Sequence, residues 1–177
     1  MTHSGRRMFF ALWPDPALSA VIERQLRNMQ PSGRWVPASK RHLTLHFLGN
    51  MSDSERDCML AAATAIQVNG FSILFDHFRF VKRSSMLWLC SESTPPELVN
   101  LVDKLGNALA TCGIAVETRR FTPHITLVRK CAKPRMMDST PMPVWCVNGF
   151  SLVESIARQG GFHYEITRHW DLGIQKT

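Results

Sequence analysis

Two copies of a short pattern, a histidine followed two residues later by a threonine, carry the residue types best suited to chemistry. His42 and Thr44 form the first copy, and His124 and Thr126 form the second. Each copy lies in a short apolar run that predicts a β-strand, and side chains at i and i+2 of a strand point to the same face. Two such pairs around one groove could bind a phosphate and move protons on both sides of it.

A wider internal repeat surrounds the two copies. The two histidines lie 82 residues apart, and two Val-Asn-Gly-Phe-Ser segments, which start at Val68 and Val147, lie 79 residues apart. An apolar strand pattern and then a helical pattern precede the histidine in both halves. We therefore expect two diverged copies of one unit, roughly residues 8–81 and 86–167, within a single domain that spans residues 1–177.

The order of the predicted elements defines the fold class. Each half reads as a strand, a helix and the motif strand, followed by further strands. Asp15 is a predicted helix cap, and Ser52 with Glu55 has the form of a capping box before a second helix. This order predicts an α+β fold with two pseudo-symmetric antiparallel-sheet lobes, outer helices and a central catalytic groove.

The net charge of +7 and the pI of about 9.6 favour an anionic partner, with nucleic acid as the first candidate. Solubility alone is the alternative explanation of the charge. The sequence has no apolar run that approaches the length of a membrane span, so no membrane partner is expected. Basic residues that flank the two motifs favour nucleic acid: Lys40, Arg41, Arg119, Arg120, Arg129 and Lys130.

The cysteines predict a reducing compartment. They are odd in number and scattered, without a C-x-x-C pair, at Cys58, Cys90, Cys112, Cys131 and Cys146. We interpret them as reduced thiols of a cytoplasmic protein, because neither a disulfide framework nor a zinc site fits this spacing.

Three segments together resemble the 2H phosphoesterase superfamily, and within it the bacterial and archaeal RNA 2′,3′-cyclic phosphodiesterases, first named 2′-5′ RNA ligases. They are FFAL at 9–12, KRHLTLHFLG at 40–49 and RFTPHITLVR at 120–129. The resemblance covers nearly the whole chain and implies hydrolysis of a cyclic phosphate without metal or cofactor. For some members it also implies reversible 2′-5′ joining of RNA ends. The implied partner is RNA with 2′,3′-cyclic phosphate ends, tRNA fragments among them, and a monomer is expected.

The chemistry of opening a cyclic phosphate suggests a role for each motif residue, and the resemblance implies which histidine is the acid and which is the base. His42 would give a proton to the departing ribose oxygen, and His124 would accept one from water. Thr44 and Thr126 would donate hydrogen bonds to the non-bridging oxygens, and Arg129 would stabilise the added negative charge. The sequence itself leaves open which histidine is the acid.

Other residues near the motifs receive weaker interpretations. His46 has the strand phase of His42 and Thr44, so we expect it to border the groove as a supporting or substrate-edge residue. Phe47 is expected in the core. Lys82 and Arg83 are interpreted as a solvated turn, and the five tryptophans as core or interface residues, although one of them, or Phe9, could stack on a base.

Three alternatives stay open at this point. The same site could serve ligation rather than hydrolysis, which product analysis would separate. The chain could be a basic RNA-binding module whose histidines are structural, which binding without turnover would reveal. A metal-dependent phosphohydrolase is disfavoured, because the motifs lack neighbouring Asp or Glu ligands.

Overall fold

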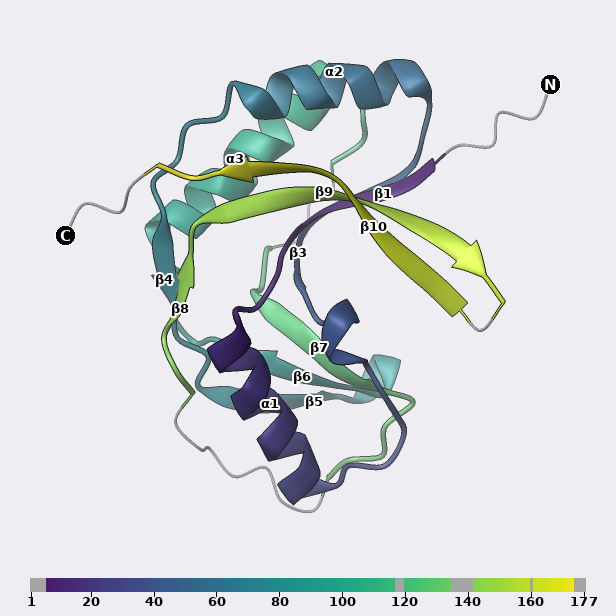
Figure 1. The fold of residues 1–177 in the computed structure, drawn as a ribbon, viewed down its shortest axis with the longest axis vertical. Helices are drawn as coiled ribbons and strands as arrows, with labels where there is room; N and C mark the ends of the chain where they lie inside the picture. Colours follow the sequence, from purple (N-terminus) through teal and green to yellow (C-terminus); the bar gives the residue numbers. More distant parts are fainter. Residues whose placement is uncertain (1–5, 117–119, 135–141, 160, 174–177) are drawn as a thin grey trace.

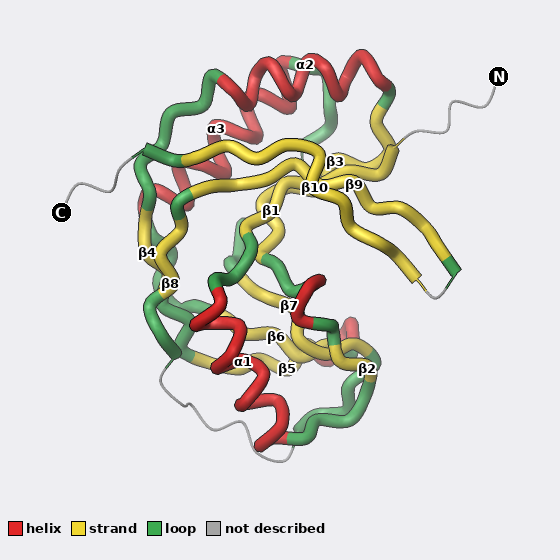
Figure 2. Tube along the Cα trace, viewed as in Figure 1, coloured by secondary structure: helices red, strands yellow, loops and turns green. Residues whose placement is uncertain are grey.

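The computed structural model describes residues 6–116, 120–134, 142–159 and 161–173, and the structural statements below concern these residues. They form strands, three α-helices and two short 3₁₀ helices (Figures 1 and 2). The elements are β1 (Arg6–Leu12), α1 (Pro16–Met29), β2 (Arg34–Trp35), η1 (Ala38–Lys40), β3 (Leu43–Met51), α2 (Asp53–Thr64), β4 (Phe71–Ile73), β5 (His77–Val81), η2 (Lys82–Ser84), β6 (Met86–Cys90), α3 (Pro96–Thr111), β7 (His124–Arg129), β8 (Trp145–Val147), β9 (Gly149–Arg158) and β10 (Gly161–Asp171).

The strands pair antiparallel in one large sheet, of order β10-β9-β1-β3-β7-β6-β5, with β2 beside β7; a small second sheet pairs β4 with β8. Figure 1 shows β1, β9 and β10 in one lobe under α2 and α3, and β5, β6 and β7 in the other. The two lobes meet between β3 and β7, which are joined by the register pair Leu43–Ile125. The predicted α+β fold with two lobes is confirmed.

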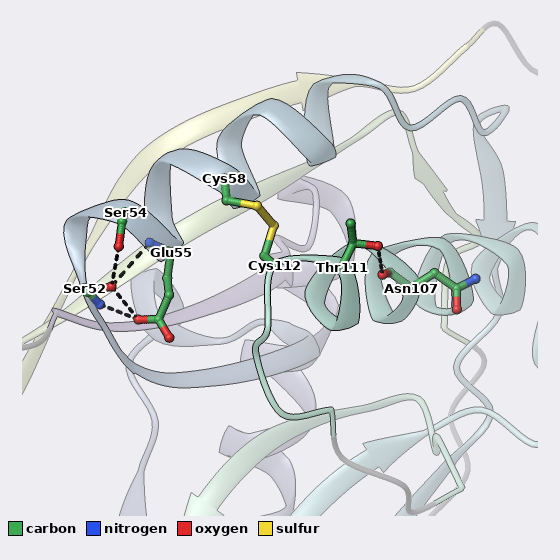
Figure 3. The surroundings of a disulfide bond; sticks show 7 residues. All are labelled: Ser52, Ser54, Glu55, Cys58, Asn107, Thr111 and Cys112. Atoms are coloured by element: carbon green, nitrogen blue, oxygen red, sulfur yellow. Dashed lines mark hydrogen bonds between the residues drawn. A yellow bond between two sulfur atoms is a disulfide. The ribbon is translucent and has the colours of Figure 1, made fainter.

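Both predicted helix starts are present. The Asp15 side chain accepts a hydrogen bond from the backbone N–H of Leu18 at 2.8 Å, and Pro16 follows at the first helical position of α1. At α2, the Ser52 and Glu55 side chains each bond to the other's backbone N–H, as a capping box requires (Figure 3). Each cap satisfies amide groups that the first turn of a helix leaves without partners.

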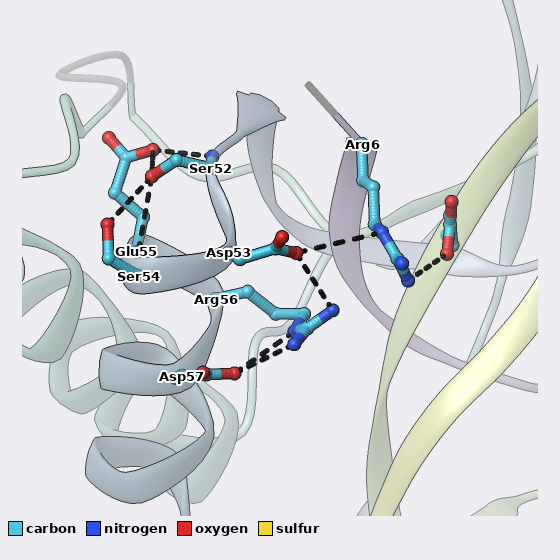
Figure 4. A network of polar contacts seen from close by, with 8 residues as sticks. Arg6, Ser52, Asp53, Ser54, Glu55, Arg56 and Asp57 are labelled. Atoms are coloured by element: carbon cyan, nitrogen blue, oxygen red, sulfur yellow. Dashed lines mark hydrogen bonds and ion pairs between the residues drawn. The ribbon is translucent and has the colours of Figure 1, made fainter. Parts of the chain in front are cut away.

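A surface network ties the start of β1 to the start of α2 (Figure 4). Arg6 lies 4.0 Å from Asp53 and 3.4 Å from Glu154 of β9. Arg56 bridges Asp53 at 3.2 Å and Asp57 at 2.9 Å. Each exposed pair contributes little to stability, so the network adds little to the free energy of folding.

Two β-bulges in β3 change which side chains reach which face. Phe10 pairs with His46 and Ala11 with Thr44, which leaves Leu45 as the extra residue of the first bulge. An extra residue reverses the alternation beyond it. His46 therefore points away from the Thr44 face, and its Nε2 lies 2.8 Å from the carbonyl oxygen of Val102 in α3. The expectation that His46 borders the site was wrong.

The same bulge moves Phe47 onto the face of Thr44. Phe47 pairs with Phe9 and is 58% exposed, so its predicted place in the core was also wrong. Most of the core is instead one large cluster that takes side chains from both lobes, and its largest fully buried members include Phe10, Phe71 and Phe150. Phe9, Ala11 and Val153 form a second, smaller buried cluster. Among the described helices, none has both the length and the apolar character that crossing a bilayer requires.

The largely apolar segment 145–154 is divided at Asn148 between two strands. β8 pairs with β4, whereas β9 pairs with β1 and β10. A side chain at Gly149 would come within 2.4 Å of the His169 ring and 2.8 Å of the Trp170 carbonyl oxygen. Glycine therefore permits the close approach of β10 at the point where the chain changes sheets.

The structure overturns the expectation that all cysteines are reduced thiols. A disulfide joins Cys58 of α2 to Cys112, the C-cap residue of α3 (Figure 3). The two cysteines are 54 residues apart in sequence, so no local motif indicates the bond. Cys90 and Cys131 are buried free thiols and Cys146 is an exposed one. The disulfide links the two helices that cover the same lobe.

Reducing this bond is expected to destabilise the fold. A cross-link over 54 residues restricts the unfolded chain by about 4 kcal/mol in the loop-entropy account. Thermal unfolding with reductant, or of the C58S/C112S double variant, should therefore occur up to roughly 16 °C lower. The C146S variant, which removes an exposed free thiol, is the matched control. Equal melting temperatures with and without reductant would contradict the prediction.

Candidate active site

The two motifs lie on neighbouring antiparallel strands. Leu43 of β3 faces Ile125 of β7, and both side chains are fully buried in the core. In a strand the residues on either side of such a position point to the opposite face. The two histidines and two threonines of the motifs flank this pair, so they share the other face of the sheet, and each is partly exposed. The structure thus brings both motifs to one place.

Each imidazole is fixed by the backbone carbonyl two residues before it. Nδ1 of His42 lies 2.8 Å from the Lys40 carbonyl oxygen, and Nδ1 of His124 lies 2.8 Å from that of Thr122. A carbonyl oxygen accepts and cannot donate, so Nδ1 carries a proton in both rings. Nε2 is then the nitrogen that can take up or release a proton in each case.

His42 is surrounded by aromatic side chains. Its ring centroid lies 4.9 Å from Phe9, 5.3 Å from Trp13 and 5.4 Å from Tyr164. Burial among them disfavours the charged ring and lowers the pKa of His42 to about 4, although the hydrogen bond to the Lys40 carbonyl opposes this shift. The positive charge of Arg129 and the neighbouring His124 lower the pKa further.

His124 lies against a single aromatic ring. The indole of Trp88 stacks on it with centroids 3.8 Å apart and planes inclined by 22°. Burial lowers the pKa of His124, the bond to the Thr122 carbonyl raises it, and the charge of Arg79 on β5 lowers it again. Both rings are therefore neutral in the free protein at neutral pH, each with Nε2 as an acceptor.

Arg129 ends β7 on the side of the sheet that carries His42. Its Nη1 lies 3.9 Å from Sδ of Met86 on β6, and its guanidinium is close enough to affect the His42 ring electrostatically. It is half-buried, so its charge is less screened by water than that of a surface arginine. A guanidinium in this position can bind an anion held between the two histidines.

The basic residues that flank the motifs have different structural roles. Arg41 is 3% exposed, pairs with Glu23 of α1 at 2.9 Å and donates to the Val36 carbonyl. It supports the fold and does not present its charge to a ligand. Arg120 and Lys130 are exposed, and Arg119 lies outside the described residues. Lys82 and Arg83 form the exposed 3₁₀ turn η2, as expected.

Sequence reasoning did not identify the aromatic partners of the histidines. Trp13 and Trp88 were grouped with core tryptophans, yet each contacts a motif histidine. The position of Trp13 could have been predicted, because Phe9, Ala11 and Trp13 occupy alternate positions from β1 onward and so share a face. The contact between Trp88 and His124 depends on the register between β6 and β7, where Trp88 pairs with Thr126.

Comparisons with known proteins agree on a family. Residues 14–141 match the model of the 2′-5′ RNA ligase superfamily. A protein of Escherichia coli named RNA 2′,3′-cyclic phosphodiesterase is 30% identical over 94% of this chain and 97% of its own length. One of the same name from Thermus thermophilus is 27% identical over 94% of this chain and 90% of its own. The crystal structure of E. coli LigT in apo form has a TM-score of 0.88 and 28% identity over 96% of this chain and 99% of that chain.

The electrostatic coupling in this site can be measured directly. Arg129→Ala should raise the pKa of His42 from about 4, because a nearby positive charge no longer opposes protonation of the ring. Titration of the imidazole nitrogens by NMR checks both the starting value and its direction of change. Arg24→Ala removes the same charge from the exposed surface of α1 and should leave His42 unaffected. A His42 midpoint near the ordinary value of 6.5 would contradict the burial argument.

Proposed function

This chain belongs to the 2′-5′ RNA ligase superfamily, and we propose that it hydrolyses 2′,3′-cyclic phosphate ends of RNA to 2′-phosphomonoesters without metal or cofactor. The observation that carries the proposal is the pair of imidazoles on neighbouring strands. Each is fixed through Nδ1 and leaves Nε2 for proton exchange. The names of the relatives from E. coli and T. thermophilus support the substrate class.

Hydrolysis would proceed by in-line displacement at phosphorus. Nε2 of His124 takes a proton from water as the water oxygen bonds to phosphorus. The bond from phosphorus to the ribose O3′ breaks, and Nε2 of His42 gives its proton to that oxygen. The products are a free 3′-hydroxyl and a 2′-phosphate. The assignment of His42 as the acid and His124 as the base rests on the resemblance of the motifs to the family.

The acid must acquire its proton before it can act. His42 is neutral in the free protein at neutral pH because burial lowers its pKa to about 4. A bound phosphodiester adds a negative charge beside the ring, and a nearby opposite charge raises the pKa of an imidazole. The same anion offsets the positive charge of Arg129, which otherwise opposes protonation. Substrate binding would therefore charge His42 and prepare it as the acid.

The threonines and Arg129 would hold the phosphate between the two rings. Hydroxyl groups of Thr44 and Thr126 donate to the non-bridging oxygens, and the guanidinium of Arg129 stabilises the charge added as water attacks. Antiparallel pairing through Leu43–Ile125 places each threonine towards the histidine of the other motif. Both repeats thus contribute to both sides of the phosphate.

Two other functions would use the same residues. A 5′-hydroxyl in place of water would give 2′-5′ ligation, and the product end distinguishes it from hydrolysis. An RNA-binding module would bind a cyclic-phosphate end without turnover. We further propose that the chain acts as a cytoplasmic monomer on RNA, with tRNA fragments among the candidate substrates.

The two-histidine mechanism is tested by hydrolysis of a cyclic-phosphate oligonucleotide in EDTA. His42→Ala and His124→Ala should each lower kcat by at least roughly 10²–10⁴-fold, the usual contribution of one positioned acid or base. The double variant should lose far less than the product of the two effects, because the residues act as a unit. Thr44→Ala and Thr126→Ala should lose less, since both proton carriers stay in place. Full activity in either histidine variant, or loss of wild-type activity in EDTA, would exclude the mechanism.

The dependence of the rate on pH tests how His42 acquires its proton. The profile should be bell-shaped, because only the singly protonated pair is productive. The kcat/KM profile reports the free enzyme and the kcat profile reports the complex. The bell in kcat should therefore lie at higher pH than the bell in kcat/KM, since bound phosphate raises the pKa values of the histidine pair. Identical bells in the two profiles would show that bound substrate does not favour protonation of the pair.

A further inference from the structure

An exposed apolar surface continues from His42 along the lobe that contains β1, β3, β9 and β10. Three of the six large hydrophobic residues that the described chain exposes lie on it: Phe47 at 58%, Phe162 at 46% and Ile166 at 54%. The strand registers place Ile166 beside Val153, Val153 beside Phe9 and Phe9 beside Phe47. Residues paired in this way point to the same face. Phe9 is buried beneath this surface and Tyr164 is half-buried at its edge. We call Phe9, Phe47, Phe162, Tyr164 and Ile166 the aromatic face.

The aromatic face reaches the candidate active site without a break. Tyr164 packs edge-on against His42 at 5.4 Å, and Phe9 contacts both of them. Phe162 and Ile166 lie two residues to either side of Tyr164 on β10 and so share its face. A single-stranded nucleic acid whose end sits at His42 would meet these rings next.

Positive charge borders the aromatic face, and the two acidic residues of the hairpin nearest to it, Glu154 and Glu165, lie on the opposite face. The Arg7 guanidinium lies 5.5 Å from the centre of the Phe162 ring. The Lys40 ammonium donates to the Phe162 carbonyl oxygen at 2.6 Å and so connects the hairpin to η1, just before His42. Glu154 of β9 and Glu165 of β10 are opposite each other in the strand register, and Glu154 is also paired with buried Met8 of β1. Both glutamates therefore lie on the other face of the hairpin. Exposed rings beside cations are the pattern that binds bases and phosphates of single strands.

The in-line reaction determines on which side of the phosphate the RNA lies. Water attacks opposite the leaving O3′, so the ribose, and the chain attached to it, must lie on the side of the acid. In the proposed function the acid is His42, which stands on the lobe that carries the aromatic face. We propose that the aromatic face binds the RNA immediately 5′ to the cyclic end, with Phe162 stacking on the base next to the terminal one. This inference rests on the proposed function.

The position of Phe162 identifies which nucleotide it would contact. Tyr164 borders His42 and is therefore beside the terminal nucleotide. Phe162 comes two residues before Tyr164 on β10, about 7 Å away, towards the end of the hairpin that projects from the sheet in Figure 1. Arg7 and Lys40 would contact the phosphate between the two nucleotides. The structure thus assigns a preference for RNA ends over cyclic mononucleotides.

The preference is measured as the ratio of kcat/KM for a cyclic-phosphate trinucleotide to kcat/KM for the cyclic mononucleotide. The wild type should prefer the trinucleotide, and Phe162→Ala should lower the ratio by roughly 5- to 150-fold, the range for loss of one base stack. Phe162→Tyr keeps a ring and should retain most of the ratio, whereas Phe162→Leu keeps the bulk and should not. Val99→Ala, on the exposed surface of α3, is the matched control.

The outcomes separate this inference from the function on which it depends. Failure of the wild type to hydrolyse either the trinucleotide or the mononucleotide would exclude the proposed function. Hydrolysis of both substrates without preference, or an unchanged ratio in Phe162→Ala, would overturn the stacking role alone. Light scattering on the same samples tests whether a second copy of the chain covers the aromatic face instead. A dimer that Phe162→Ala converts to monomer would also overturn the inference, and circular dichroism checks that each variant is folded.

Discussion

The pairing of Leu43 with Ile125 is the constraint on which the rest of the structure depends. It is the register pair between β3 and β7, and so the point where the two lobes of the large sheet join. Both side chains are fully buried, and burial of two such residues is worth roughly 3–6 kcal/mol. Because strand side chains alternate, the contact that joins the lobes also sets both histidines and both threonines on the opposite face. The relative placement of the two motifs is therefore held by the core, and a shift of register by one residue would separate them.

The surroundings of the two histidines show how one motif can yield two different groups. Both rings use the same bond from Nδ1 to the carbonyl two residues earlier. They differ in what covers them: three aromatic rings around His42 and one stacked indole on His124. Pairs of titratable groups in unlike environments are a frequent source of separate acid and base roles. Duplication would supply the symmetric hydrogen bonds, and later divergence of the neighbouring side chains would distinguish the two halves.

The sequence was sufficient for features that depend on local chemistry or on simple periodicity. The caps at Asp15 and Ser52 and the two-lobed α+β fold follow from such patterns, and the structure has them. It was insufficient wherever one inserted residue or a distant partner decides the outcome. The bulge at Leu45 reverses the faces of His46 and Phe47, and alternation alone cannot indicate it. The disulfide was missed for the second reason, because Cys58 and Cys112 meet only when α2 and α3 pack together. The disulfide also removes part of the support that cysteine spacing gave to a reducing compartment. The cytoplasmic location stays a prediction.

The aromatic residues near His42 link the chemistry of the site to the choice of substrate. Phe9 and Tyr164 exclude water from the ring, and this exclusion lowers the pKa of His42. A site that depends on substrate charge to protonate its acid is inactive until an anion occupies it. The same rings begin the exposed surface that leads to Phe162. A ligand that covers them removes still more water, which by itself lowers the pKa of His42 further, but it also lets the negative charge of the phosphate act on the ring through a less polar medium and with greater effect. Binding of neighbouring bases would thus favour protonation of the acid, as well as position the chain, to the extent that the phosphate charge outweighs the loss of water.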